Sequence, residues 1–389
     1  PRRPLEGGAL LVTTASAIPV SLDDPVNVAI LAVSEDKLEG FQRDPLGEIS
    51  QRSGIGLDVV VKRIRALLQA GTVRRVRQTL LSTNLAQGAL VAWQVPSDRL
   101  QAAFDFMFQQ DPFSGHVVIR TTDAATPGST YKLWTTLKVP QGYSMEKHAD
   151  YLAAQVGAES YRLMPAKALF VLGVGHTRRR GMEPGSKSDS LAEVTYTEVI
   201  ELSELEWQAL IAMKREFSPE EIVPDIWQSR AQEADLSLST FYEVAESLSQ
   251  RKAIGRFSTF LEHVKPVADG QRVTRYNVLF HWAVPPGREV EAGREVGRHH
   301  ILTHCYWREA GEGFPNVNLM AVAHGTDKAR LLQHKAAIDA HLKSVGIPVS
   351  YTNVFWGGRS EIKPSEISPF LYREWCERAG LDPESMRAT

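Results

Sequence analysis

The sequence predicts an α+β protein in which one two-part unit occurs twice in tandem. Three matches, in the same order in both halves, indicate the repeat. They pair residues 92–96 with 281–285, His116-x-x-x-Arg120 with His304-x-x-x-Arg308, and 131–138 with 317–324. The stretch between the copies is rich in Gly, Ser, Pro and charged residues, which predicts an exposed linker over 176–198.

The first part of each copy has the pattern of a winged helix-turn-helix. In copy 1 a helical period begins at 28–31, a short helix follows at 45–49, and 54–56 forms a turn. Asp58 is the expected N-cap of a third helix, which ends at Gly71 before a strand at 73–76. Copy 2 repeats this plan at 206–211, 224–226 and 241–248. The two units are therefore expected over 25–77 and 199–260.

The second part of each copy predicts a ferredoxin-like sandwich of order β-α-β-β-α-β. A strand at 89–93 or 276–280 comes first, and a helix such as 98–106 follows it. Two strands then carry His-x-x-x-Arg and either Trp134 or Met320, and a last helix spans 144–156 or 327–345. These sandwiches are expected over 78–175 and 261–365, with a C-terminal tail at 366–389.

Composition narrows the classes of function. The 389 residues are 43% hydrophobic and carry a formal net charge of -2, so the whole molecule does not attract nucleic acid or anionic membranes. Cys305 and Cys376 are the only cysteines, too few for a disulfide scaffold or a zinc module. No apolar run approaches the length of a membrane span, and 9–12 is too short for a signal segment. We expect a cytoplasmic protein without a membrane partner.

Binding of DNA through the helical units is not favoured by their charges. Copy 1 offers Lys62, Arg63 and Arg65 on the third helix, but copy 2 offers Glu243 and Glu246 there. An acidic unit facing phosphates loses the counterion-release contribution to affinity. The units are therefore expected to act in packing or pairing, with the basic residues of copy 1 on a solvated helix face.

A polar constellation on the second sandwich is the main candidate site. Alternation along a strand puts His300, His304, Tyr306 and Arg308 on one face. This face could simply be solvated, but a binding role is favoured because His-x-x-x-Arg occurs in both copies beside further rings and cations. These neighbours are Tyr131, Lys132, Trp134, Lys138 and His324. The span from His304 to Arg308, roughly 13 Å, suits a broad, flat ligand with several carboxylates, such as a macrocycle.

A metal site built by the protein alone is not expected. His300 and His304 lie too far apart on a strand to share one ion, and His299 faces away. A single histidine could still be an axial ligand to a metal that a tetrapyrrole carries. Cys305 lies on the face opposite His304 and is expected to be a buried, inert thiol.

These motifs resemble those of known families. Tandem units of this kind resemble Lrp/AsnC-type regulators, and 304–308, 314–319 and 323–325 resemble siroheme decarboxylases. Residues 131–138 are similar to the aromatic strand of that family's partner subunit. The resemblance implies a fusion of two subunits that removes carboxyl groups from acetate side chains of a tetrapyrrole in haem biosynthesis. It implies no cofactor beyond the iron tetrapyrrole substrate and helical units that no longer read DNA.

The resemblance also suggests a role for each candidate residue. The expected acids are His116, His304 and His324, and the expected apolar wall is Tyr131, Trp134 and Tyr306. The expected carboxylate anchors are Arg120, Lys132, Lys138, Lys167 and Arg308, with His300 on the same binding face. Copy 2 lacks a counterpart of Lys167 and its nearest cation is Arg359, so the two copies are expected to hold unequal pockets.

The proton donor is expected among the histidines of copy 2. A lysine gives up its proton too reluctantly unless it is buried, so His304 and His324 should matter more than His116. Two alternatives remain at this point: a haem- or tetrapyrrole-responsive regulator that binds DNA through copy 1, and a tetrapyrrole carrier without turnover. Pairing of whole chains into a homo-oligomer is also left open.

Overall fold

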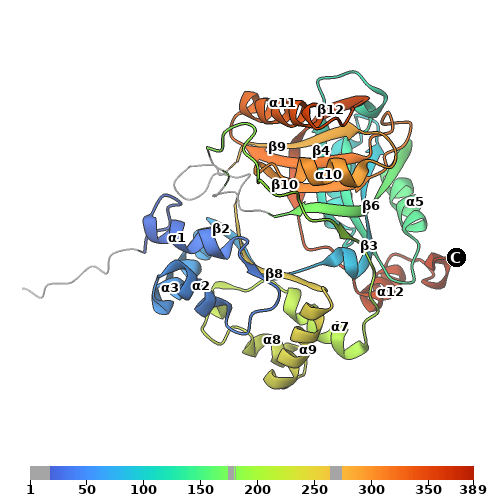
Figure 1. The fold of residues 1–389 in the computed structure, drawn as a ribbon. Helices are drawn as coiled ribbons and strands as arrows, with labels where there is room; N and C mark the ends of the chain where they lie inside the picture. The colour runs from blue at the N-terminus through green and yellow to red at the C-terminus, as the bar shows by residue number, and fades with distance from the viewer. Residues whose placement is uncertain (1–17, 174–178, 180, 263–273) are drawn as a thin grey trace, which may run out of the picture.

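The computed structural model describes residues 18–173, 179, 181–262 and 274–389, and confirms the α+β class. Figure 1 shows two regions, a helical one that contains the N-terminal half of each copy and a strand-rich one that contains the rest. No helix in the described ranges is long and apolar enough to span a membrane.

The helical region consists of two units that share one sheet. Helical unit 1 contains α1 (Pro25–Ser34), β1 (Leu38–Glu39), α2 (Pro45–Ser53), α3 (Leu57–Gln69) and β2 (Val73–Leu80). Helical unit 2 contains α7 (Glu204–Lys214), η3 (Pro219–Glu221), α8 (Gln228–Glu233), α9 (Leu238–Gln250) and β8 (Ile254–Leu261). Strand β8 lies between β1 and β2, so a strand of copy 2 completes the sheet of copy 1. Both units bury their apolar side chains in one common core.

Local capping explains where several of these helices begin. The Asp24 side chain accepts hydrogen bonds from the first turn of α1, and Ser203 and Glu206 form a reciprocal capping box on α7. The expectation that Asp58 caps α3 is wrong. Gly56 occupies the N-cap position, and Asp58 lies inside the first turn, where its charge favours the positive end of the helix dipole.

The strand-rich region has the same element order in both copies. Copy 1 contributes η1 (Ser82–Asn84), β3 (Ala86–Gln94), α4 (Leu100–Gln109), β4 (Ser114–Thr121), η2 (Pro127–Thr130), β5 (Leu133–Pro140), α5 (Met145–Val156), β6 (Ser160–Leu172) and β7 (Thr195–Tyr196). Copy 2 contributes β9 (Tyr276–Ala283), α10 (Glu289–Gly297), β10 (Leu302–Arg308), β11 (Leu319–Gly325), α11 (Lys328–Ser344) and β12 (Tyr351–Ile362). Within each copy the second strand lies at one edge, followed by the third, the first and the fourth.

The two four-stranded sheets join into one closed sheet. Strand β12 pairs with β4, and β10 pairs with β6, both antiparallel, so the ring runs β10-β11-β9-β12-β4-β5-β3-β6 and returns to β10. Because side chains alternate along each strand, one set faces the interior and the other faces the helices. Helices α4 and α5 cover the copy 1 half, and α10 and α11 cover the copy 2 half.

The C-terminal segment is not a free tail. Residues 366–389 contain α12 (Pro369–Arg378) and η4 (Glu384–Met386), which pack on the copy 1 half. Tyr372 is fully buried, and its hydroxyl lies 2.9 Å from Nδ1 of His148 in α5. The expected tail is therefore a structural part of the first sandwich.

Candidate active site

One cavity, of about 390 Å³, lies between the interior of the closed sheet and the strands of the helical units. Its volume is within the range of small-molecule sites. The closed sheet contributes the polar residues His116, Arg120, Thr136, Asn277, His304, Tyr306, Arg308 and His324. The facing wall includes Arg74, Arg75, Arg77, Lys214, Phe260 and Lys363. We call this space the central cavity.

Both His-x-x-x-Arg motifs line the central cavity. Strands β4 and β10, which carry them, are opposite each other in the closed sheet because three strands separate them in each direction. His116 and Arg120 therefore approach from one side, and His304 and Arg308 from the other. The expectation of a separate pocket in each copy is wrong, because closure of the sheet merges the two polar faces into one space.

His304 is held as a neutral ring with a free lone pair. Its Nδ1 lies 3.0 Å from Oγ1 of Thr303, and that hydroxyl donates to the carbonyl of Val322 at 3.1 Å. The hydroxyl can then only accept from His304, so Nδ1 carries the proton and Nε2 does not. Burial, together with the charges of Arg256, Arg179 and Arg308, lowers the pKa of His304 to about 3.

His324 belongs to the same hydrogen-bond network. Its Nδ1 lies 3.3 Å from the Thr303 hydroxyl, and its Nε2 lies 3.2 Å from Nδ2 of Asn277. The Oδ1 of Asn277 accepts a hydrogen bond from Arg120 at 3.2 Å, so Asn277 joins the copy 2 histidine to the copy 1 arginine. On the opposite strand, Nε2 of His116 lies 2.8 Å from the Ser360 hydroxyl.

The two motif arginines keep their charge in a buried setting. Arg308 donates to the Met164 carbonyl at 2.5 Å and lies 4.6 Å from the centre of the Tyr306 ring. Burial lowers the pKa of Arg120 and of Arg308 to about 10, so both remain cationic near neutral pH. Neither forms an ion pair with a carboxylate of the described residues, and buried cations of this kind suit the binding of anions.

Lys138 departs from the behaviour expected of a lysine. It alternates with Thr136 and Trp134 on the interior face of β5, although it does not line the central cavity itself. Burial, with a smaller contribution from Arg308, lowers its pKa to about 7. A lysine can act as a proton donor near neutral pH when burial lowers its pKa, and Lys138 is such a lysine.

Several predicted site residues lie outside the central cavity. Trp134 is fully buried deeper in the closed sheet, where its ring meets those of Phe314 and Phe355. Tyr131 packs on Phe314, and Lys132 is half-buried with its carbonyl accepting from the Arg120 amide. They support the cavity from behind and do not form its wall.

Two further predicted ligand-binding residues, Lys167 and His300, lie outside the central cavity. The ammonium of Lys167 is on the outside of β6, where it pairs with Glu309 and lies 5.0 Å from the Trp307 ring centre. His300 is exposed and precedes β10, so strand alternation does not apply to it; its Nδ1 lies 3.1 Å from the Ser186 hydroxyl. Arg359, the expected cation of copy 2, is also outside and pairs with Asp105.

The sequence reasoning missed the cations on the facing wall of the central cavity. Seven of the lining residues are Arg or Lys, whereas Glu35 is the single acidic one. Three of the seven, Arg74, Arg75 and Arg77, stand within four residues on β2. That run was visible in the sequence, but the pattern placed it in the wing of a helical unit and gave no sign that the wing faces the sandwich.

The described residues form neither a metal-binding cluster nor a reactive thiol at the central cavity. Within the described ranges, no group of three or more His, Cys, Asp or Glu side chains could hold a metal ion. Cys305 is fully buried, and burial raises the pKa of its thiol. Its side chain packs in the apolar core under α10 and α11, away from His304.

Two of the three basic side chains on α3 are engaged within the protein. Arg63 pairs with Asp24 at 3.1 Å, and Arg65 donates to the carbonyls of Pro219 and Ile222 in helical unit 2. The expectation that they form a solvated helix face therefore holds for the exposed Lys62 alone. Guanidinium groups that stabilise the helical region are poorly placed to bind DNA phosphates.

Comparison with known proteins identifies relatives of the chain. It matches the AsnC-like ligand binding domain family twice, over residues 85–170 and 274–351, one match in each copy. It is 26% identical to the siroheme decarboxylase of Hydrogenobacter thermophilus over 73% of this chain and 78% of that one. It is also 26% identical to the siroheme decarboxylase beta subunit of Desulfovibrio desulfuricans, over 31% of this chain and 79% of that subunit.

Solved structures share the fold. The crystal structure of the siroheme decarboxylase NirDL superimposes with a TM-score of 0.63 at 21% identity, covering 92% of this chain and 99% of that one. The same protein in complex with an iron-uroporphyrin III analogue gives a TM-score of 0.61. The sequence relatives and the family matches confirm the resemblance to siroheme decarboxylases that the motifs indicated, and the solved structures show that the fold is shared.

Proposed function

We propose that this chain, a member of the siroheme decarboxylase family, removes carboxyl groups from acetate side chains of siroheme or a closely related iron tetrapyrrole. The observation that carries the proposal is the central cavity itself. In a chain of net charge -2, it gathers seven Arg or Lys side chains and one acid around the two His-x-x-x-Arg motifs. A ligand with carboxylates around its whole edge matches such a lining.

The proposed reaction breaks the bond between the acetate methylene and its carboxylate. Carbon dioxide leaves, the electron pair remains on the methylene carbon, and an acid delivers a proton that completes a methyl group. Arg120 and Arg308 hold carboxylates on opposite sides of the ligand, while Tyr306 and Met320 exclude water from the wall. The iron belongs to the substrate, and the protein supplies binding, orientation and the proton.

His304 is our candidate donor, with His324 beside it. His304 is neutral near pH 7, because its pKa is lowered to about 3. An incoming carboxylate introduces the opposite charge, favours the imidazolium and raises that pKa, so substrate binding itself would load the proton. Lys138, which has a pKa of about 7 and is affected by the charge of Arg308, is our candidate for the group that recharges the network.

The proposal also covers the domain type of each copy. We assign each copy as a winged helix-turn-helix followed by a ferredoxin-like domain, on the strength of its element order and strand order. Relatives named as single subunits match about a third of this chain, which supports the view that both subunits are fused here. The regulator alternative is not retained, since Arg63 and Arg65 are engaged internally.

Anaerobic incubation with siroheme followed by mass spectrometry tests the activity. We expect successive losses of carbon dioxide with the wild-type chain and none with Arg308→Gln, which removes a carboxylate anchor. Arg359→Gln, on the outer surface, is the matched control and should retain activity. Absence of carbon dioxide loss from the wild type would refute the decarboxylase, and spectral binding without product would indicate a carrier.

A further inference from the structure

Two arginines on the facing wall of the central cavity form no ion pair with any described residue. Arg74 and Arg77 on β2 both line the cavity. Within the described part of the chain, neither guanidinium has a hydrogen bond or an ion pair, and the Nε atom of each is buried without a partner. The guanidinium of Arg77 lies over the Phe260 ring, with its Cζ 5.4 Å from the ring centre.

The other cations of this wall show the difference. Arg75 pairs with Glu216 at 2.9 Å and donates to the Ile362 carbonyl, and Lys214 pairs with Glu366 at 2.8 Å. Lys363 donates to the carbonyls of Phe108 and Asp111. Arg75 and Lys214 thereby hold the helical units against the strand-rich region, and Lys363 is engaged within that region. Arg74 and Arg77 have no such task.

Two guanidinium groups in this setting destabilise the folded protein. Burial lowers the pKa of Arg74 and lowers that of Arg77 to about 10. Arg75 repels both side chains, while the charge of Glu216 attracts both without forming an ion pair with either. Buried donors without acceptors and like charges side by side both destabilise a fold. Such groups are characteristic of binding sites, where the ligand supplies the missing partners.

We propose that Arg74 and Arg77 bind peripheral carboxylates of the tetrapyrrole that the motif arginines do not reach, so that helical unit 1 forms one wall of the substrate site. This inference rests on the proposed function for the identity of the ligand. It gives the helical units a role other than DNA binding, because β2 contributes cations to the lining of the central cavity.

Titration of iron uroporphyrin III, followed by absorbance, tests this assignment. The variants are Arg74→Gln, Arg77→Gln, the double variant and Arg77→Lys. Lys62→Gln is the matched control, because it removes one positive charge from an exposed position of α3 in the same helical unit, outside the cavity. We expect each glutamine to weaken binding about tenfold and the double variant about a hundredfold. Arg77→Lys should retain part of the affinity, and Lys62→Gln all of it.

Melting without ligand separates a binding role from a structural one. If the arginines serve the ligand, the glutamine variants melt at or above the wild-type temperature, because a half-buried charge that has no ion pair within the described residues has been removed. Weaker binding combined with a lower melting temperature would assign them to the fold and overturn the proposal. Wild-type affinity in the double variant would overturn it as well. Failure of the wild type to bind iron uroporphyrin III would instead refute the proposed function, and this inference with it.

Discussion

At the scale of single residues, the two copies of His-x-x-x-Arg are unequal despite facing the same cavity. His304 lies beside Tyr306 and Arg308 and shares the Thr303 hydroxyl with His324. The corresponding position of copy 1, His116, has Val118 and Arg120 on its strand, and its ring contacts Ser360. A donor needs both proximity to the reacting carbon and a route for its proton, and copy 2 offers the fuller network.

The first prediction follows from this asymmetry. We expect His304→Ala to reduce product formation by at least a hundredfold, the usual contribution of an acid or base, and to change affinity much less. His116→Ala should reduce turnover less than tenfold. Turnover of siroheme and binding of iron uroporphyrin III, measured on both variants, check this. The reverse pattern would move the donor to copy 1, and equal losses would make the pair act together.

His281 is a buried histidine that the reaction does not explain. It is fully buried among Trp134, Phe314 and Phe355, and within the described residues neither ring nitrogen has a hydrogen-bond partner. Burial, then the charges of Arg120 and Lys335, lower its pKa to about 3. A polar ring in an aromatic cluster loses its hydration without compensation, so it destabilises the fold.

The second prediction concerns acid stability. The unfolded chain protonates His281 near pH 6.5, whereas the folded chain resists protonation down to about 3. Stability is therefore lost as pH falls through this window, by up to about 1.4 kcal/mol per pH unit. We expect His281→Phe to be more stable at pH 7 and to lose less stability between pH 6.5 and 4, as measured by urea unfolding. The exposed His300→Ala should keep the wild-type slope; parallel curves for His281→Phe would contradict the assignment.

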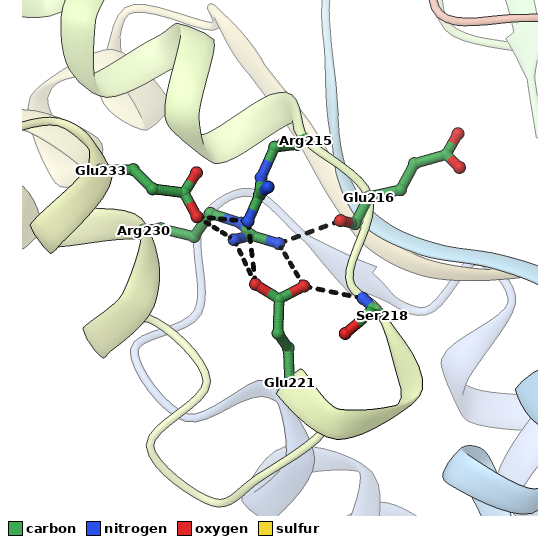
Figure 2. Close-up of polar contacts among 6 residues, drawn as sticks. All are labelled: Arg215, Glu216, Ser218, Glu221, Arg230 and Glu233. Carbon is green, nitrogen blue, oxygen red and sulfur yellow. Dashed lines mark hydrogen bonds and ion pairs between the residues drawn. The ribbon is translucent and has the colours of Figure 1, made fainter.

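At the scale of elements, a buried arginine holds helical unit 2 together. Figure 2 shows Arg230 of α8 bridging Glu221 and Glu233 while also donating to the backbone carbonyl of Glu216. Its Cζ lies 4.3 Å from the Phe217 ring centre, and its side chain is fully buried. Burial alone would raise the pKa of Glu221, but hydrogen bonds from Arg230 and the Ser218 amide lower it to about 2.

The third prediction tests this network. Arg230→Met removes the cation between two carboxylates, so we expect a loss of about 3 kcal/mol in urea unfolding. Arg215→Gln, whose exposed side chain joins the same carboxylates from outside, should cost less than about 1 kcal/mol. The lowered pKa of Glu221 adds stability above pH 4.5 that is lost as pH falls through about 2, and Arg230→Met should weaken this acid sensitivity. Equal, small losses in both variants would argue against a structural network.

The elements themselves were largely predictable, because their signals are local. Periodic apolar residues, turn glycines and the repeat located most helices and strands within a few residues, as at α5 and α11. Alternation also predicted that His304, Tyr306 and Arg308 share a face. It does not apply to His300, because the strand begins after that residue. Alternation says which residues share a face but not which face is inside.

At the scale of the whole molecule, the decisive feature is pairing between the copies. Strand pairs β12–β4, β10–β6 and β2–β8 all join one copy to the other. No local pattern encodes such long-range pairing, because a strand edge offers the same backbone donors and acceptors to any partner. This is why the sequence indicated two separate sandwiches with two pockets, and why the arginines of β2 were missed as part of the site.

The last prediction follows from this pairing. A protease site inserted after Ser190, in the exposed segment between the copies, would cut the chain without touching any of the three strand pairs. We expect the cut protein to elute from a sizing column with the intact protein and to bind iron uroporphyrin III equally well. After separation in denaturant, neither fragment should bind alone, because each supplies only one of the two motifs that line the cavity. Mixing the fragments on refolding should restore binding. A single fragment that binds as tightly as the whole would show that one copy holds a complete site, and fragments that part in native buffer would show that the linker, not the strand pairing, holds the copies together.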